Sequence, residues 1–301
     1  MTMRFLTAFL LICISLATAD SQENSSNSWE FHTSGNIVYK RLNYTRGEPA
    51  VSESGSELSY SLDASVEYNS NDWIHSFEIS LSGDWIVDKE NMPSLDTSAW
   101  ETSLGLGYSL IGNSLTLDAG TSISLTEEDG WNPDFFLWAE KYFARIDKQK
   151  FGAAFWGYES LEGTKSLVLY GSWRRYVKYG WKGSVYAGGR FDADSVRSSD
   201  YWLKWVGPAL KTSFSYRFKT DISVDARLNM FYGFAVGMPD ADLEKFNTSW
   251  GVNASWTPKY FGIFAGLDQF YKYYVFPTDY VFPYSKKSTY TLLKAGIKWN
   301  I

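Results

Sequence analysis

Cysteine and histidine are nearly missing from this chain of 301 residues, which contains 1 Cys and 2 His. A disulfide-held fold needs several cysteines, and a Cys/His metal centre needs a cluster of both residue types. Positive charge is not in excess either, because 28 basic residues face 34 acidic ones, for a net charge of −6. Binding to nucleic-acid phosphates requires clustered Lys and Arg. We therefore expect no disulfide framework, no bound metal, no cofactor and no nucleic-acid partner.

Long apolar runs are also scarce. The one near the start, Phe5 to Leu16, follows Arg4 and precedes the small residues Ala17, Thr18 and Ala19. A charged residue, a short apolar run and an A-x-A pattern are typical of a cleaved secretory signal peptide. No later stretch reaches the ~18 apolar residues of a transmembrane helix.

The chain is accordingly divided into three parts. We expect residues 1–19 to be a signal peptide, residues 20–27 a short polar leader, and residues 28–301 a single domain.

Aromatic residues are abundant, at 18% of the chain with 14 Trp, 21 Tyr and 20 Phe. Many of them stand in segments where apolar residues alternate with polar, small or charged ones. The clearest segments are Leu58 to Tyr68, Trp100 to Leu110, Leu115 to Leu125, Ile222 to Tyr232 and Trp250 to Trp256. Alternation with a period of two predicts β-strands that have one apolar face and one polar face.

The length of these segments favours a membrane barrel over a soluble sandwich. Soluble strands usually have about 5 or 6 residues, whereas Leu58 to Tyr68 covers 11. A strand of about 12 residues, tilted by about 45°, rises roughly 28 Å, which matches the hydrocarbon thickness of a bilayer.

The connections between these segments alternate between short and long. The short ones are Asn69 to Asp72, Ile111 to Ser114, Asp147 to Lys150, Lys178 to Gly180, Lys219 to Asp221 and Thr257 to Lys259. The long ones are Arg41 to Ser56, Asp88 to Ser98, Glu127 to Asp134, Glu159 to Lys165, Asp192 to Asp200, Ala235 to Phe246 and Phe276 to Lys287. Short turns on one side and longer loops on the other are typical of outer-membrane barrels.

These connections predict an all-β fold: a transmembrane, antiparallel, up-and-down β-barrel of about 14 strands, within a range of about 12 to 16. The count treats Tyr201 to Lys219 as one long strand with a kink or bulge at Gly207 and Pro208. Two strands there would give about fifteen and place the two ends of the barrel chain on opposite sides. The segment from 135 to 180 alternates poorly, so its register is left open.

The closing stretch places Leu293, Ala295, Ile297, Trp299 and Ile301 on one face. It resembles the carboxy-terminal strand of Gram-negative outer-membrane barrels, although those usually end in Phe or Trp rather than Ile. In size and strand number the chain looks most like the monomeric fourteen-stranded porins. The resemblance implies a location in the bacterial outer membrane, contact with the lipid bilayer, and recognition of the last strand by the barrel-assembly machinery.

Tryptophans near the expected strand ends suit the boundary between lipid and water, because the ring is apolar and its N–H is polar. The predicted membrane-interface aromatics are Trp29, Trp73, Trp85, Trp100, Trp250, Trp256 and Trp299, with Trp181 in a similar place.

The polar faces of the strands are expected to line the lumen, and their charges differ between the two halves of the chain. We call the carboxylates of the first half the acidic wall: Glu57, Asp63, Glu67, Glu78, Asp84, Glu101 and Asp118. We call the cations of the second half the basic wall: Lys182, Arg190, Lys211, Arg217, Arg227, Lys272, Lys294 and Lys298. Walls of opposite charge would create a field across a wet lumen.

The resulting functional expectation is a porin-like channel for passive diffusion of small hydrophilic solutes through a polarised lumen. The basic wall, with Tyr and Trp nearby, would suit a sugar acid or an oligosaccharide, but no residue fixes the solute. One alternative is a surface or adhesion barrel without an open pore. An outer-membrane hydrolase is disfavoured, because His32 and His75 are placed far from the long loops, and we expect no enzyme.

Overall fold

The computed structural model describes residues 28–47, 51–70, 72–86, 100–126, 130–160, 164–177, 179–195, 202–236, 243–275 and 287–301. Within these residues the chain forms one closed barrel of fourteen antiparallel strands. The predicted signal peptide and polar leader lie outside the described residues. None of the described residues belongs to a helix with the length and hydrophobicity needed to cross a membrane.

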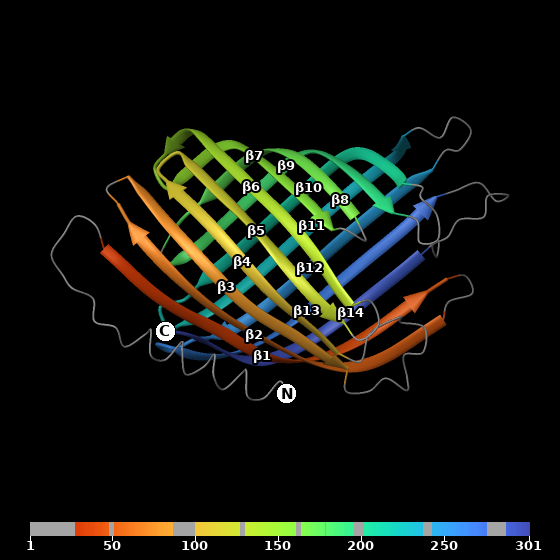
Figure 1. Ribbon diagram of the computed structural model, residues 1–301, viewed down its shortest axis with the longest axis horizontal. Helices are drawn as coiled ribbons and strands as arrows, with labels where there is room; N and C mark the ends of the chain where they lie inside the picture. Colours follow the sequence, from red (N-terminus) through yellow and green to blue (C-terminus); the bar gives the residue numbers. More distant parts are fainter. Residues whose placement is uncertain are drawn as a thin grey trace.

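The strands follow one another around the barrel in sequence order, and β1 closes the ring by pairing with β14 (Figure 1). Their bounds are β1 Ser28–Arg46, β2 Val51–Asn69, β3 Trp73–Ile86, β4 Trp100–Gly112, β5 Leu115–Thr126, β6 Gly130–Ile146, β7 Gln149–Ser160, β8 Thr164–Arg175, β9 Gly180–Ser195, β10 Trp202–Arg217, β11 Ile222–Val236, β12 Glu244–Trp256, β13 Phe261–Val275 and β14 Lys287–Asn300.

Alternation along each strand separates an apolar outer face from a polar inner one. On β3 the outward Phe77 and Ile79 are about half exposed, at 54% and 47%, while Glu78 between them lines an interior cavity. Large exposed hydrophobic side chains recur on the outer face of nearly every strand. A soluble protein rarely exposes such a continuous apolar surface, whereas a bilayer requires one. Both the predicted barrel and its strand number are therefore confirmed.

Tight turns connect the strands at one end of the barrel, which we call the short-turn end; it also holds the start of β1 and the end of β14. Three residues in these turns have left-handed backbone conformations: Asp147 (φ 51°), Asp221 (φ 61°) and Lys259 (φ 55°). Asp tolerates this conformation because its short polar side chain can bond locally, whereas Lys has no such compensation.

Several connections that the sequence predicts to be long loops are shorter in the structure. Arg41 to Ser56 was expected to be a long loop, but β1 extends to Arg46 and β2 begins at Val51. Cross-strand contacts explain the extension, because Tyr44 stacks on Tyr290 of β14 with ring centroids 4.3 Å apart. Several other connections expected to be long are likewise shorter, as strands continue into them: β5 to β6 spans residues 127–129 and β7 to β8 residues 161–163.

Residues 202–217 form one strand, as predicted, but without a bulge. The pairing of β10 with β11 is interrupted at Gly207 and Pro208 and resumes with the same register. Pro208 has no backbone N–H to donate, which accounts for the gap in the ladder. The register does shift elsewhere, between Tyr142 and Ala144 on β6, where Phe143 is the extra residue and is 73% exposed. This bulge lies in the segment where alternation is poor.

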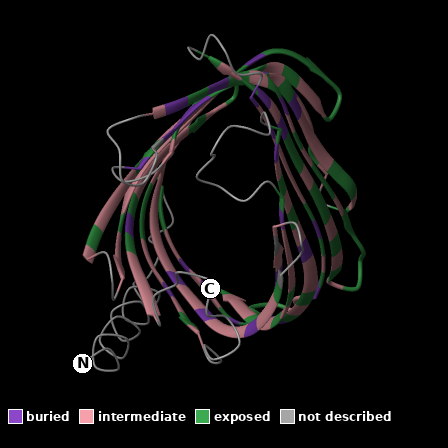
Figure 2. Ribbon diagram, turned by 90° about the vertical axis from the view of Figure 1, so that its right-hand side faces the viewer, coloured by how far each residue is buried: buried purple, intermediate pink, exposed green. Residues whose placement is uncertain are grey.

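Buried apolar side chains inside the barrel gather on one wall rather than at its centre. They come from β7 to β13 and include Trp205, Phe231 and Tyr274, each at most 2% exposed. Figure 2 shows the strands as a ring around the interior, with buried positions distributed along the walls. The interior on this side is therefore narrowed by packed side chains.

Candidate functional site

The acidic wall lies on four consecutive strands: Glu57, Asp63 and Glu67 on β2, Glu78 and Asp84 on β3, Glu101 on β4, and Asp118 on β5. Two of its members share a cation. Lys40 of β1 lies 2.5 Å from Glu57 Oε1 and 3.1 Å from Asp84 Oδ1, measured from its Nζ. Asp63 instead accepts a hydrogen bond from Ser34 Oγ at 3.4 Å. Lys40 thus offsets the negative charge locally, away from the short-turn end.

Near the short-turn end the interior is strongly acidic. A cavity of about 520 Å³ is lined by Glu30, His32, Ser34, Asp63, Ser65, Glu67, Glu78 and Asn300. His32 Nε2 lies 3.6 Å from a carboxylate oxygen of both Glu30 and Glu67. The ligand-type atoms of these three residues lie within 4.8 Å of one another, a grouping that the sequence analysis missed. All three are partly exposed, and a protonated His32 would pair with both carboxylates without any metal.

Several members of the basic wall are paired with carboxylates. Arg190 Nε donates to Asp192 Oδ1 at 2.6 Å. Asp268 of β13 binds both Arg227, at 3.0 Å, and Lys294, at 2.7 Å. The basic wall is therefore less positive than a count of its cations indicates.

The remaining members of the basic wall have different surroundings. Lys298 donates to Ser255 Oγ at 3.1 Å, and Arg217 lies 3.9 Å from Asp221. Lys182 lines a cavity in the short-turn half. Lys211 Nζ lies 5.3 Å from the ring centroid of Trp138, a cation–π distance.

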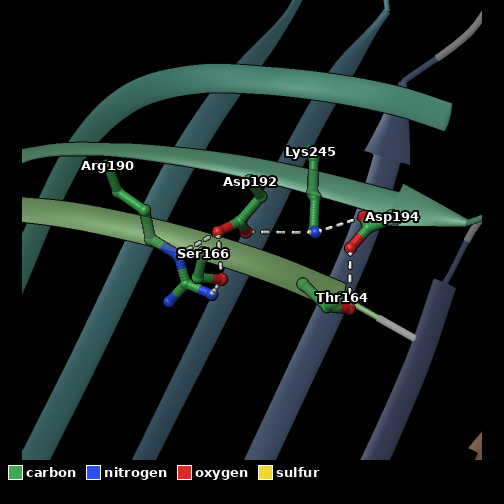
Figure 3. Close-up of polar contacts among 6 residues, drawn as sticks. All are labelled: Thr164, Ser166, Arg190, Asp192, Asp194 and Lys245. Atoms are coloured by element: carbon green, nitrogen blue, oxygen red, sulfur yellow. Dashed lines mark hydrogen bonds and ion pairs between the residues drawn. The ribbon is translucent and has the colours of Figure 1, made fainter. Parts of the chain in front are cut away.

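A buried ionic cluster on β8, β9 and β12 was not predicted (Figure 3). Lys245 reaches from β12 to Asp194 at 2.6 Å and to Asp192 at 3.4 Å. Asp192 also accepts from Ser166 Oγ at 2.6 Å, and Thr164 Oγ1 donates to Asp194 at 3.0 Å. The Lys245 and Asp192 side chains are 3% and 0% exposed. Lys245 was overlooked because it lies within the expected loop Ala235 to Phe246, where no inner face could be assigned.

A second ion pair inside the barrel was missed for a related reason. Arg174 of β8 lies 2.5 Å from Glu140 of β6, whose side chain is fully buried, and also donates to the hydroxyl of Tyr186. These residues lie in or next to the segment whose register the sequence left open. The poor alternation there reflects large side chains that point into the barrel.

The interior contains two neighbouring cavities that share part of their lining. The first, of about 660 Å³, lies toward the middle of the barrel, and the second, of about 550 Å³, lies nearer the short-turn end. Trp138 and Lys211 line both of them. This pair of side chains therefore lies at the boundary between the two cavities.

The predicted interface tryptophans have varied positions on the outer face. Trp29 packs against Tyr68 and Trp85 against Tyr60, with ring centroids 4.8 and 5.5 Å apart. Trp250, however, lies in the middle of β12 rather than at its end.

The other predicted tryptophans lie at or near strand ends. Trp100 stands opposite Trp85 on the neighbouring strand, and Trp73 stands opposite Gly112. Trp256 ends β12, and Trp299 stands opposite Phe261.

A hydrolase of the kind considered from the sequence would need a histidine near the long loops, and neither histidine lies there. His32 belongs to the acidic cavity near the short-turn end. His75 lies on the outer face, where its Nδ1 is 3.0 Å from the hydroxyl of Tyr108. Within the described residues, neither imidazole forms a hydrogen bond with a serine hydroxyl.

No family profile and no curated protein matches the sequence. Among solved structures, the chain is similar to Pseudomonas aeruginosa OccK2 in complex with glucuronate (10% identity, TM-score 0.45), with 90% of this chain and 98% of that chain covered. It is also similar to OmpT, an outer membrane protein of Vibrio cholerae, with 8% identity and a TM-score of 0.45. That match covers 94% of this chain and 100% of that chain. A third similar structure is a BenF-like porin from Pseudomonas fluorescens Pf-5, with 9% identity and a TM-score of 0.38. The match covers 88% of this chain and 98% of that chain.

This likeness concerns general barrel architecture. The closed ring, the even strand number and the apolar outer face independently make the chain an outer-membrane-type β-barrel.

Proposed function

We propose that the chain is a porin-like channel that lets small hydrophilic solutes diffuse passively across the outer membrane. One observation carries the proposal: two interior cavities, of about 660 and 550 Å³, adjoin each other at Trp138 and Lys211, which line both. Barrels of eight strands are filled by side chains, and those of sixteen or more leave a channel. Fourteen strands, with one wall packed, are compatible with a narrow wet path.

The lumen of this channel is proposed to be polarised. Carboxylates without a described cation partner concentrate around the acidic cavity, for example Asp63 and Glu78. Cations concentrate on the strands from β8 to β14, where Lys211 lines both the 660 and the 550 Å³ cavities and Lys182 lines the second. Charges of one sign in a low-dielectric cleft concentrate ions of the opposite sign. Cations should therefore gather along the acidic wall, and anions along the strands from β8 to β14.

Planar-bilayer recording tests both parts of the proposal. The purified barrel should give stable conductance steps in KCl. Neutralising the acidic cavity with Asp63→Asn, Glu67→Gln and Glu78→Gln should move the reversal potential in a salt gradient toward anion selectivity. Glu159→Gln is the control, because this residue is exposed and pairs with Lys165 away from that cavity. Absence of conductance steps would refute the channel and leave a barrel that acts only as an anchor.

Export and assembly are proposed to use the two ends of the chain. Cleavage after Ala19 would leave Asp20 as the first residue, which mass spectrometry of the mature protein checks. The outward residues of β14, Trp299 among them, are proposed to be recognised by the barrel-assembly machinery. Trp299→Ala should lower the amount of folded barrel in the outer membrane.

A further inference from the structure

The 660 Å³ cavity has an unusual charge composition. Arg190, Lys211 and Lys272 are among the described residues that line it, and no carboxylate is. The volume lies within the ~300–1,000 Å³ that small-ligand sites commonly have. A cavity lined by cations alone favours an anionic occupant, since each buried charge is stabilised by an opposite one.

The three cations differ in how strongly carboxylates of the protein already neutralise their charge. Arg190 is bound by Asp192 at 2.6 Å, and Lys272 interacts electrostatically with Asp194. Lys211 interacts electrostatically with Glu140 and Arg174 but forms no ion pair within the described part of the chain. Its Nζ faces the ring of Trp138 at 5.3 Å. An ammonium group over an aromatic ring keeps its capacity to donate hydrogen bonds to an anion. Lys211 is thus the cation best able to bind a ligand.

The rest of the lining combines flat apolar surfaces with hydrogen-bonding groups. Seven aromatic residues contribute: Trp138, Trp156, Tyr170, Phe231, Phe270, Tyr271 and Tyr290. Asn247 lines the same cavity, and its Oδ1 atom is buried with no hydrogen-bond partner in the described structure. A buried acceptor without a partner costs free energy, which a ligand hydroxyl would recover.

We propose that this cavity is a binding subsite for a hydroxylated ring that carries a carboxylate, the chemical class of the sugar acids. The carboxylate would accept hydrogen bonds from Lys211, a ring hydroxyl would donate to Asn247, and the apolar faces of the sugar would pack on the aromatic rings. Because Lys211 also lines the next cavity, the anion can keep this contact while it moves toward the short-turn end. The inference rests on the proposed channel function and adds a solute class to it.

Three sugars that share the galactose ring but differ in charge test the role of the carboxylate. Galacturonate is anionic, galactose is neutral and galactosamine is cationic. Equilibrium binding to the detergent-purified barrel should be tightest for galacturonate and weakest for galactosamine. Lys211→Met should weaken galacturonate binding about tenfold, the usual order for a lost hydrogen bond to a charged group. Galactose binding should stay unchanged, and Lys211→Arg should retain most of the affinity for galacturonate.

Lys204→Met is the matched control, because Lys204 is an exposed residue of the same strand that lines neither of these cavities. Equal affinity for the three probes, or equal behaviour of Lys211→Met and Lys204→Met, would overturn the inference. Galactose 6-phosphate is a further arm: binding tighter than that of galacturonate would assign the site to phosphates and refute the carboxylate.

The same protein in a planar bilayer distinguishes failure of this inference from failure of the channel. Conductance in KCl without any effect of galacturonate refutes the subsite and leaves the channel standing. Galacturonate binding in detergent without conductance refutes the channel. If both hold, galacturonate should interrupt the current of the unmodified barrel, and should do so less in the Lys211→Met variant.

Discussion

Replacing Lys245 by Met tests whether the buried ionic cluster of Figure 3 stabilises the barrel. The change removes one of two cations that face two carboxylates. Asp192 keeps Arg190 and Ser166 as partners, both at 2.6 Å. Asp194 loses its 2.6 Å contact and retains Thr164 at 3.0 Å. The cost therefore falls mainly on the carboxylate of Asp194.

Breaking a buried ion pair from one side typically costs about 3–5 kcal/mol. Two features place the expected cost of Lys245→Met at the lower end of this range. The Asp194 side chain is 11% exposed, so water reaches part of it. Lys272 also interacts with Asp194 and provides some compensation. We expect Lys245→Met to lower the free energy of unfolding by about 3 kcal/mol.

A double-mutant cycle separates the lost pair from lost packing. Asp194→Asn combined with Lys245→Met removes the unpaired charge, so the double variant should be more stable than the sum of the single changes predicts. We expect a coupling free energy of about 2 kcal/mol. Urea unfolding in lipid vesicles, followed by tryptophan fluorescence, measures all four proteins, and Lys204→Met serves as a surface control that should change stability by less than about 0.5 kcal/mol. A coupling of zero, or a single-variant cost as small as that of the control, would refute the reasoning.

Three further predictions concern stability and assembly. Trp205→Ala, at a fully buried position, should cost about 3–5 kcal/mol in urea unfolding, while Trp131→Ala, at a 68% exposed position, should cost much less. Gly35→Val should reduce the folded fraction seen by gel mobility, because a Cβ at Gly35 overlaps an indole of β14; Gly189→Val meets no atom within 4 Å and should fold normally. Lys259→Gly should raise stability by about 1 kcal/mol, because its φ of 55° is strained for a residue with a Cβ, and an unchanged urea midpoint would contradict this.

Strand number was predictable from the sequence because the outer face obeys one simple rule. Lipid requires an apolar side chain at every second position, and this rule acts on each strand separately. Strand ends were harder to predict. Beyond Arg41 the strands β1 and β2 continue through contacts such as Thr45 with Ser52, whose hydroxyls lie 3.1 Å apart. Such contacts depend on the partner strand and leave no periodic signal.

The inner face follows no comparable rule, because the position of each inner side chain depends on the residues of other strands that it contacts. Arg190 was placed on the basic wall, yet its charge is balanced by Asp192 two residues later. The cavity at Lys211 and Trp138 is lined by residues of strands from both halves of the chain. Neither charge pairing nor cavity shape could be derived from alternation alone.

The closure between β1 and β14 has a consequence for the order of folding. Every other strand pair joins neighbours in sequence, whereas Thr33 and Ile301 exchange backbone hydrogen bonds of 2.8 Å across nearly the whole chain. Local hairpins form quickly, and contacts between distant segments carry the largest loss of chain entropy. Until that last pairing forms, two strands expose unpaired backbone groups that hydrocarbon cannot satisfy. The pairing of β1 with β14 should therefore limit the rate of barrel formation. A folding catalyst would accelerate folding most by acting on these two strands.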